Sequence, residues 1–98
     1  MFYYKIFNVG SDVLLAVCDE NLLGKEIHFD DSVFEVKKDF YGESKCSVGE
    51  IIGFLEKATI INAVGNEIVK LLIKEGYVED GKTIEIGGVL HAQVVTFE

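Results

Sequence analysis

Alternation of apolar and polar residues predicts strands near the start of the chain. Phe2 to Val9 is aromatic and β-branched, and Val13 to Asp19 is apolar on both faces, as expected of a central strand. The turn residues Gly10-Ser11-Asp12 join these segments, so we expect an antiparallel hairpin. Ser32 to Lys38 alternates well and predicts a third, less deeply buried strand.

Residue patterns typical of strands occur again near the end of the chain. Thr83 to Ile86 and Val89 to Phe97 are expected to form the last two strands, with Gly87-Gly88 breaking or bulging the backbone between them. Asn21 to Lys25 suggests a tight connection or a single helical turn, and Asp39 to Cys46 suggests a loop.

Two segments in the middle repeat their apolar residues at helical spacing. Ser47 and Glu50 match the capping box, which predicts a helix from Val48 to Lys57. A second helix is expected from Asn62 to Glu75, and Gly76 follows it as a left-handed capping residue. The Asn62 amide has two interpretations, a helix N-cap or a ligand contact.

A glycine inside the expected second helix needs a reason. Gly65 lies one turn from its start, where glycine destabilises a helix by about 1 kcal/mol relative to alanine. Its presence suggests close packing against another backbone or a ligand. Together these elements predict one α+β domain over residues 1–98. A mostly antiparallel sheet of N- and C-terminal strands would carry two helices packed on one face.

The net charge of the chain limits the kinds of molecule that it is expected to bind. Seventeen acidic residues oppose nine lysines, there is no arginine, and the formal net charge is −8. Nucleic-acid affinity depends on cations that neutralise phosphates, so the composition argues against DNA binding. The acidity either keeps an apolar domain in solution or attracts a cationic partner. Because the chain is 49% hydrophobic, we expect apolar surface that contacts a protein partner or a second copy in a homodimer.

Cysteine usage and hydropathy indicate a compartment. Cys18 and Cys46 form no disulfide pattern, and the segment Met1 to Ile6 lacks the features of a signal peptide. The longest strongly apolar run, Val13 to Cys18, is far shorter than a membrane span. These features predict a cytoplasmic protein without a membrane segment, in which Cys18 is a small core residue.

Candidate chemistry centres on His91 and Gln93, which would share one face of the last strand. The imidazole could act as acid or base, and the amide could orient a small-molecule ligand. The alternative is that neighbouring backbone groups satisfy both side chains. His28 and the two cysteines lie at no spacing typical of a metal site, and no nucleotide-binding motif occurs. We therefore expect neither metal nor cofactor.

Short motifs in a fixed order suggest a relationship. They are Asp19 with Leu22-Leu23-Gly24-Lys25, Phe40-Tyr41-Gly42, the trio Ala58, Asn62 and Gly65, and Gly88-Val89 with His91-Ala92-Gln93. This pattern, which runs over most of the chain, resembles that of a family of short archaeal proteins known as domain of unknown function family 424. Leu90 departs from it, because the family has proline before the histidine.

The resemblance implies a small archaeal cytosolic protein and brings no activity with it. It also implies that Lys25, Tyr41, Asn62, His91 and Gln93 form one binding site. Because the sequence holds no complete catalytic set, the leading hypothesis is a non-enzymatic binding or adaptor module in an archaeal complex such as the translation apparatus. The alternative is a small-molecule enzyme that uses His91 as acid or base.

Overall fold

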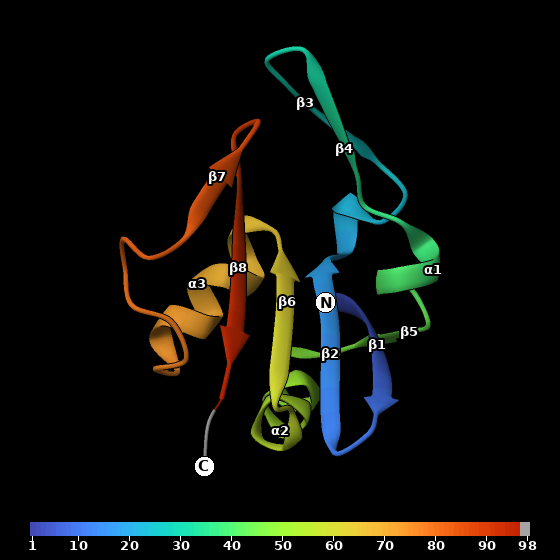
Figure 1. Ribbon diagram of the computed structural model, residues 1–98, viewed down its shortest axis with the longest axis vertical. Coiled ribbons are helices and arrows are strands. Elements are labelled where there is room, and N and C mark those ends of the chain that lie inside the picture. The colour runs from blue at the N-terminus through green and yellow to red at the C-terminus, as the bar shows by residue number, and fades with distance from the viewer. Residues whose placement is uncertain (97–98) are drawn as a thin grey trace.

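The computed structural model describes residues 1–96, which form a six-stranded sheet, a separate two-stranded hairpin and three α-helices (Figure 1). In spatial order the sheet contains β5 (Ser44–Cys46), β1 (Phe2–Val9), β2 (Asp12–Asp19), β6 (Ile60–Val64), β8 (Val89–Val95) and β7 (Ile84–Ile86). Only the pair β2 and β6 is parallel among these neighbours. The predicted α+β class with a mostly antiparallel sheet is therefore confirmed.

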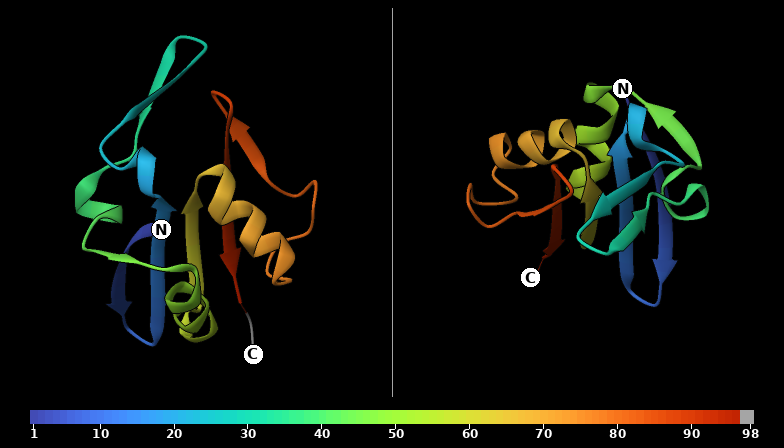
Figure 2. Two further views of the ribbon diagram at one scale, coloured as in Figure 1. Left: turned by 180° about the vertical axis from the view of Figure 1, so that it is seen from behind. Right: turned by 90° about the horizontal axis from the view of Figure 1, so that it is seen from above.

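The remaining elements connect and cover the sheet. They are the 3₁₀ turn η1 (Glu20–Leu22), the hairpin strands β3 (Glu26–Phe29) and β4 (Ser32–Glu35), and the helices α1 (Lys38–Tyr41), α2 (Val48–Lys57) and α3 (Asn66–Lys74). Seen from above, the β3–β4 hairpin lies on the opposite side of the sheet from α3 (Figure 2). Within residues 1–96, no helix has the length and apolar character needed to cross a bilayer.

Two local predictions are confirmed in detail. β1 and β2 form an antiparallel hairpin whose register runs from Phe2 opposite Asp19 to Val9 opposite Asp12. The capping box starts α2 as expected, since the Glu50 backbone N–H donates to Ser47 Oγ at 3.2 Å. The Ser47 N–H donates to Glu50 Oε1 at 3.0 Å in return. These bonds lower the pKa of the Glu50 carboxyl.

The predicted start of the second helix is wrong. Ile60–Val64 is the strand β6, which pairs parallel with β2 and antiparallel with β8. The helix α3 begins only at Asn66, because Gly65 has φ of +132° and interrupts any helical run. Asn62 is therefore a strand residue and no helix cap. The predicted left-handed residue after the helix is confirmed, with φ of +84° at Gly76.

Other boundaries also differ from the expectation. The third strand ends at Glu35 and pairs with β3, which the sequence did not suggest, outside the main sheet. The predicted loop Asp39 to Cys46 contains most of α1 and all of β5. Gly87 and Gly88, with φ of +58° and +83°, form the two-residue turn between β7 and β8. Phe97, assigned to the last strand, lies outside the described residues.

Alternation along the strands divides the core into two clusters. The first, the helix-side cluster, contains the buried side chains of α2 and α3 together with sheet residues such as Leu15, Val17, Ile61 and Ala92. The second, the hairpin-side cluster, contains Ala16, Cys18, Ile27, Val36, Tyr41 and Val64. Because neighbours along a strand point to opposite faces, Asn62, His91 and Gln93 fall on the face of the hairpin-side cluster.

Candidate functional site

Three of the predicted site residues line one pocket. β6 and β8 place Asn62 opposite Gln93 and Val64 opposite His91, so the three polar side chains lie on one face of adjacent strands. The pocket has a volume of about 280 Å³ and is lined by Asn62, Lys82, Ile84, Ile86, His91, Ala92 and Gln93. That size is near the lower end for small-molecule sites. The sheet register, and not sequence proximity, brings Asn62 to the other two.

Tyr41 reaches this site through Asn62. The Tyr41 hydroxyl donates a hydrogen bond to Asn62 Oδ1 at 3.2 Å. Burial raises the pKa of the Tyr41 phenol to about 12, so the group stays protonated and keeps its donor near neutral pH. Because Oδ1 accepts this bond, the amide is held in one orientation and its Nδ2 remains for the pocket that Asn62 lines.

His91 is held by packing. Its ring meets the ring of Phe34 edge to face, with centroids 4.9 Å apart and planes at 82°. Nε2 is buried and has no hydrogen-bond partner among residues 1–96. Burial also lowers the pKa of the imidazole, which favours its uncharged form at neutral pH. A buried polar atom without a partner costs roughly 1–3 kcal/mol, so this nitrogen is available to a ligand that reaches it.

Lys25 is not brought to the pocket. Its side chain is exposed and does not contribute to the lining, while its backbone carbonyl accepts from the Val36 N–H at 2.9 Å. The structure thus brings Tyr41, Asn62, His91 and Gln93 together and leaves Lys25 beside the β3–β4 hairpin. Binding by the four residues stays a prediction.

Lys82 is a lining residue that the sequence analysis missed. It ends the acidic segment that follows α3 and lies just before β7. Its position as a cation at the end of an acidic segment, just before a predicted strand, is a signal that could have identified it. β7 also contributes Ile84 and Ile86, so one short segment supplies both a positive charge and an apolar wall.

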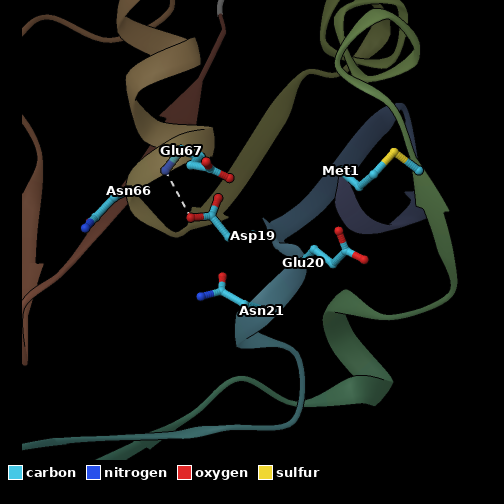
Figure 3. A pocket seen from close by; sticks show the side chains of 6 residues that line it. All are labelled: Met1, Asp19, Glu20, Asn21, Asn66 and Glu67. Atoms are coloured by element: carbon cyan, nitrogen blue, oxygen red, sulfur yellow. Dashed lines mark hydrogen bonds between the residues drawn. The ribbon is translucent and has the colours of Figure 1, made fainter.

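A second, larger hollow lies at the carboxyl ends of the parallel strands β2 and β6 (Figure 3). Its volume is about 460 Å³, and its lining consists of Met1, Asp19, Glu20, Asn21, Asn66 and Glu67. Asp19 is only 5% exposed, and it accepts from the backbone N–H of Glu67 at 3.0 Å and of Ile68 at 2.8 Å. Both oxygens therefore cap the start of α3, and burial raises the pKa of this carboxyl against the effect of the two bonds.

The rest of the chain offers little further chemistry. Within residues 1–96, no three His, Cys, Asp or Glu side chains gather into a group that could hold a metal ion. Cys18 and Cys46 are free and buried, and burial raises their thiol pKa values to about 12 and about 11. Cys18 belongs to the hairpin-side cluster, as expected of a small core residue.

Residues of the family motifs build the face that carries the pocket. Leu22, Leu23, Phe40 and Tyr41 all pack into the hairpin-side cluster. The motif glycine at position 65 has a different function, because a Cβ there would lie 2.3 Å from Asp19 Cγ. Several motif residues thus have a packing role, and Asn62, His91 and Gln93 line the pocket, whereas the Lys25 side chain does neither.

Comparison with known proteins supports the family resemblance that the motifs suggested. The profile of a family described as "Protein of unknown function (DUF424)" matches residues 7–97. The crystal structure of an uncharacterized conserved protein from Methanopyrus kandleri is similar with a TM-score of 0.80 and 25% identity. The similarity covers 99% of this chain and 94% of that protein. A search of curated proteins finds no match.

Proposed function

The chain belongs to the DUF424 family of proteins of unknown function, and we propose that it is a non-enzymatic binding module whose ligand occupies the Asn62–His91–Gln93 pocket. The observation that carries the proposal is the convergence of these side chains, with the Tyr41 hydroxyl fixing the Asn62 amide. Polar groups that converge in a partly apolar pocket are the usual arrangement of a ligand site.

The division of the core supports this location. We propose that α2 and α3 pack together on one face of the sheet, where their side chains share the helix-side cluster. α1 and the hairpin cover only part of the other face, where Asn62 and His91 are partly exposed and Gln93 is exposed. When most of the core lies on one face of a sheet, the other face can present polar residues to a ligand.

Exposed apolar side chains near the pocket support an adaptor role. Ile84 and Val95 are 64% and 50% exposed, and the sheet register places both on the same face as His91. Apolar residues around a polar centre suit a protein partner or a second copy of the chain. We propose a partner in the translation apparatus by association with other archaeal cytosolic proteins alone. Affinity capture with the wild type and Ile84→Glu tests it, since a specific partner is lost with the variant.

Catalysis is the second candidate, and one observation favours it. The lowered pKa of His91 keeps the imidazole uncharged near neutral pH, as a general base requires. Residues 1–96 supply no carboxylate to the pocket lining, and the Tyr41 phenol is held protonated. Since no carboxylate from residues 1–96 lies at the pocket to activate His91, binding is the better supported function.

Ligand-observed and protein-observed NMR test the proposal. A set of small fragments with cationic, neutral and anionic members is titrated into ¹⁵N-labelled protein. We expect some fragments to shift the amide resonances of Asn62, His91 and Gln93. His91→Ala should abolish these shifts and leave the melting temperature nearly unchanged.

Asn21→Ala, which alters the other hollow, is the matched control and should bind as the wild type does. If no fragment of any charge shifts the pocket resonances, the binding proposal is wrong. A large loss of stability in His91→Ala would assign the residue to packing. Turnover of a bound fragment, lost in His91→Ala, would favour the enzyme.

A further inference from the structure

We infer that the ligand of the Asn62–His91–Gln93 pocket presents a carboxylate on a short aliphatic group. This inference rests on the proposed function, because it names the chemical class that the same pocket would take. The first argument is the polarity of the fixed groups. Asn62 Oδ1 already accepts from Tyr41, so the amide offers the pocket its two N–H donors. A ligand must therefore bring an acceptor to this position.

The second argument is local charge. Lys82 lines the pocket, and none of the aspartates and glutamates among residues 1–96 does. This is unusual in a chain with seventeen acidic residues and nine cations, and the other hollow is lined by three carboxylates. Glu85, the nearest acid along β7, pairs opposite Leu90 and points to the opposite face. An ammonium beside amide donors attracts an anion, and charge-assisted hydrogen bonds are the stronger kind.

The third argument separates carboxylate from phosphate. Phosphate sites in proteins usually combine a lysine or an arginine fork with further donors from a glycine-rich loop or the N-terminus of a helix. The chain has no arginine. The N-terminus of α3 is already capped by Asp19 on the other side of the sheet. One lysine and the amides of Asn62 and Gln93 match the two oxygens and single charge of a carboxylate better than the charge of a phosphate.

The fourth argument fixes the rest of the ligand. Ile84 and Ile86 form an apolar wall beside the donors, and the pocket volume of about 280 Å³ admits only a small group. An aliphatic chain of a few carbons fits this wall. Two sources could supply such a group, namely a free short-chain acid or the C-terminal residue of a peptide. The free edge of β7 lies next to the pocket and could pair with the backbone of such a peptide.

Calorimetry with three matched probes tests the inference. 3-Methylbutanoate, 3-methylbutanamide and 3-methylbutylamine share the aliphatic group and differ in charge. We expect the carboxylate to bind about tenfold more tightly than the amide at low salt, with the amine weakest. Lys82→Gln should weaken carboxylate binding about two- to fivefold and leave amide binding unchanged, as expected for a partly exposed ion pair. Asn62→Asp should remove carboxylate binding.

Lys57→Gln, which makes the same charge change in α2, is the control and should bind as the wild type does. Acetyl-Gly-Gly-Val with a free carboxyl group and its amide distinguish the two sources. A peptide acid that binds much more tightly than 3-methylbutanoate identifies a chain terminus, and equal affinities identify a free acid. Amide or amine binding as tight as that of the acid overturns the carboxylate inference alone. Failure of all three probes overturns this inference, and the pocket's role in binding fails with it only if the fragment titrations also shift no pocket resonance.

Discussion

Gly65→Ala should destabilise the protein strongly, because two effects coincide at this position. Gly65 has φ of +132° and ψ of 146°, a conformation that is essentially restricted to glycine. A Cβ there would lie 2.3 Å from Asp19 Cγ and 2.5 Å from both carboxylate oxygens. The methyl group must therefore displace the carboxylate that caps α3.

The expected loss in free energy of unfolding follows from these two effects. Backbone strain of this kind costs about 1–3 kcal/mol. Displacing Asp19 removes its bonds to the Glu67 and Ile68 N–H groups, and the loss of a helix cap costs about 0.5–2 kcal/mol. We expect a total of roughly 2–5 kcal/mol. For a chain of this size, this corresponds to a fall in melting temperature of roughly 8–20 °C.

Thermal and urea denaturation followed by circular dichroism measure this loss. Gly10→Ala is the control, since Gly10 also has positive φ, +61°, but a Cβ there would meet nothing within 4 Å. It should cost only about 1–2 kcal/mol. Asp19→Ala completes the comparison, because without the carboxylate Gly65→Ala should lose only the backbone part. The reasoning is refuted if Gly65→Ala costs no more than Gly10→Ala, or costs the same with and without Asp19.

Three further predictions concern titration and reactivity. Burial raises the folded-state pKa of Asp19 above its ordinary value, so the wild type should lose stability relative to Asp19→Asn as pH rises from about 4 through the folded pKa. A constant difference between the two unfolding free energies over this range would contradict that assignment. Burial lowers the folded-state pKa of His91, so the wild type should lose stability relative to His91→Gln as pH falls below about 6.5 towards the folded pKa. NMR titration of the ring should give a midpoint below that value. Cys18 and Cys46 should resist iodoacetamide at pH 8 in the native state and react in urea, since burial keeps both as thiols; rapid native labelling would show that either is accessible.

Features determined by neighbours in sequence could be predicted. The capping box of α2 depends on Ser47 and Glu50, three residues apart, and its bounds agree with the expectation. The β1–β2 hairpin depends on one short turn. The motif order also identified the family over residues 7–97. In each case the information is contained in a short window or in a fixed order of short windows.

The strand β6 could not be predicted in this way. Ile60–Val64 is followed by α3, and Val64 fits the apolar stripe that continues through Ile68 and Leu72. The local pattern therefore extended the helix backwards. What makes the segment a strand is pairing with β2, more than 40 residues earlier, and with β8, about 30 residues later. The positive φ of Gly65 marks the boundary between β6 and α3. The sequence alone suggested close packing against another backbone or a ligand as the reason for this glycine.

The same long-range pairing explains what was found and missed at the site. His91 and Gln93 could be recognised because alternation on one strand places them together. Asn62 was assigned to the site by the family motif but placed on the wrong element. Lys82 was missed because its approach to Asn62 depends on the order β6, β8, β7 in the sheet.

The position of Asn62 in a central strand leads to a last prediction. Asparagine is depleted in strands, and its partner Tyr41 is 4% exposed, so this polar pair lies beside apolar residues. Replacing both members of a buried hydrogen bond by apolar groups is often neutral or stabilising, whereas replacing one leaves the other without a partner.

If the pair is retained for binding, Asn62→Val with Tyr41→Phe should keep or raise the melting temperature and abolish fragment binding. Asn62→Val alone should be destabilised by about 1–3 kcal/mol, since the Tyr41 hydroxyl loses its acceptor. Differential scanning calorimetry of the two single variants and the double variant decides the matter. A double variant less stable than both single variants would show that the pair serves the fold, and the argument for a binding role at Asn62 would lose its support.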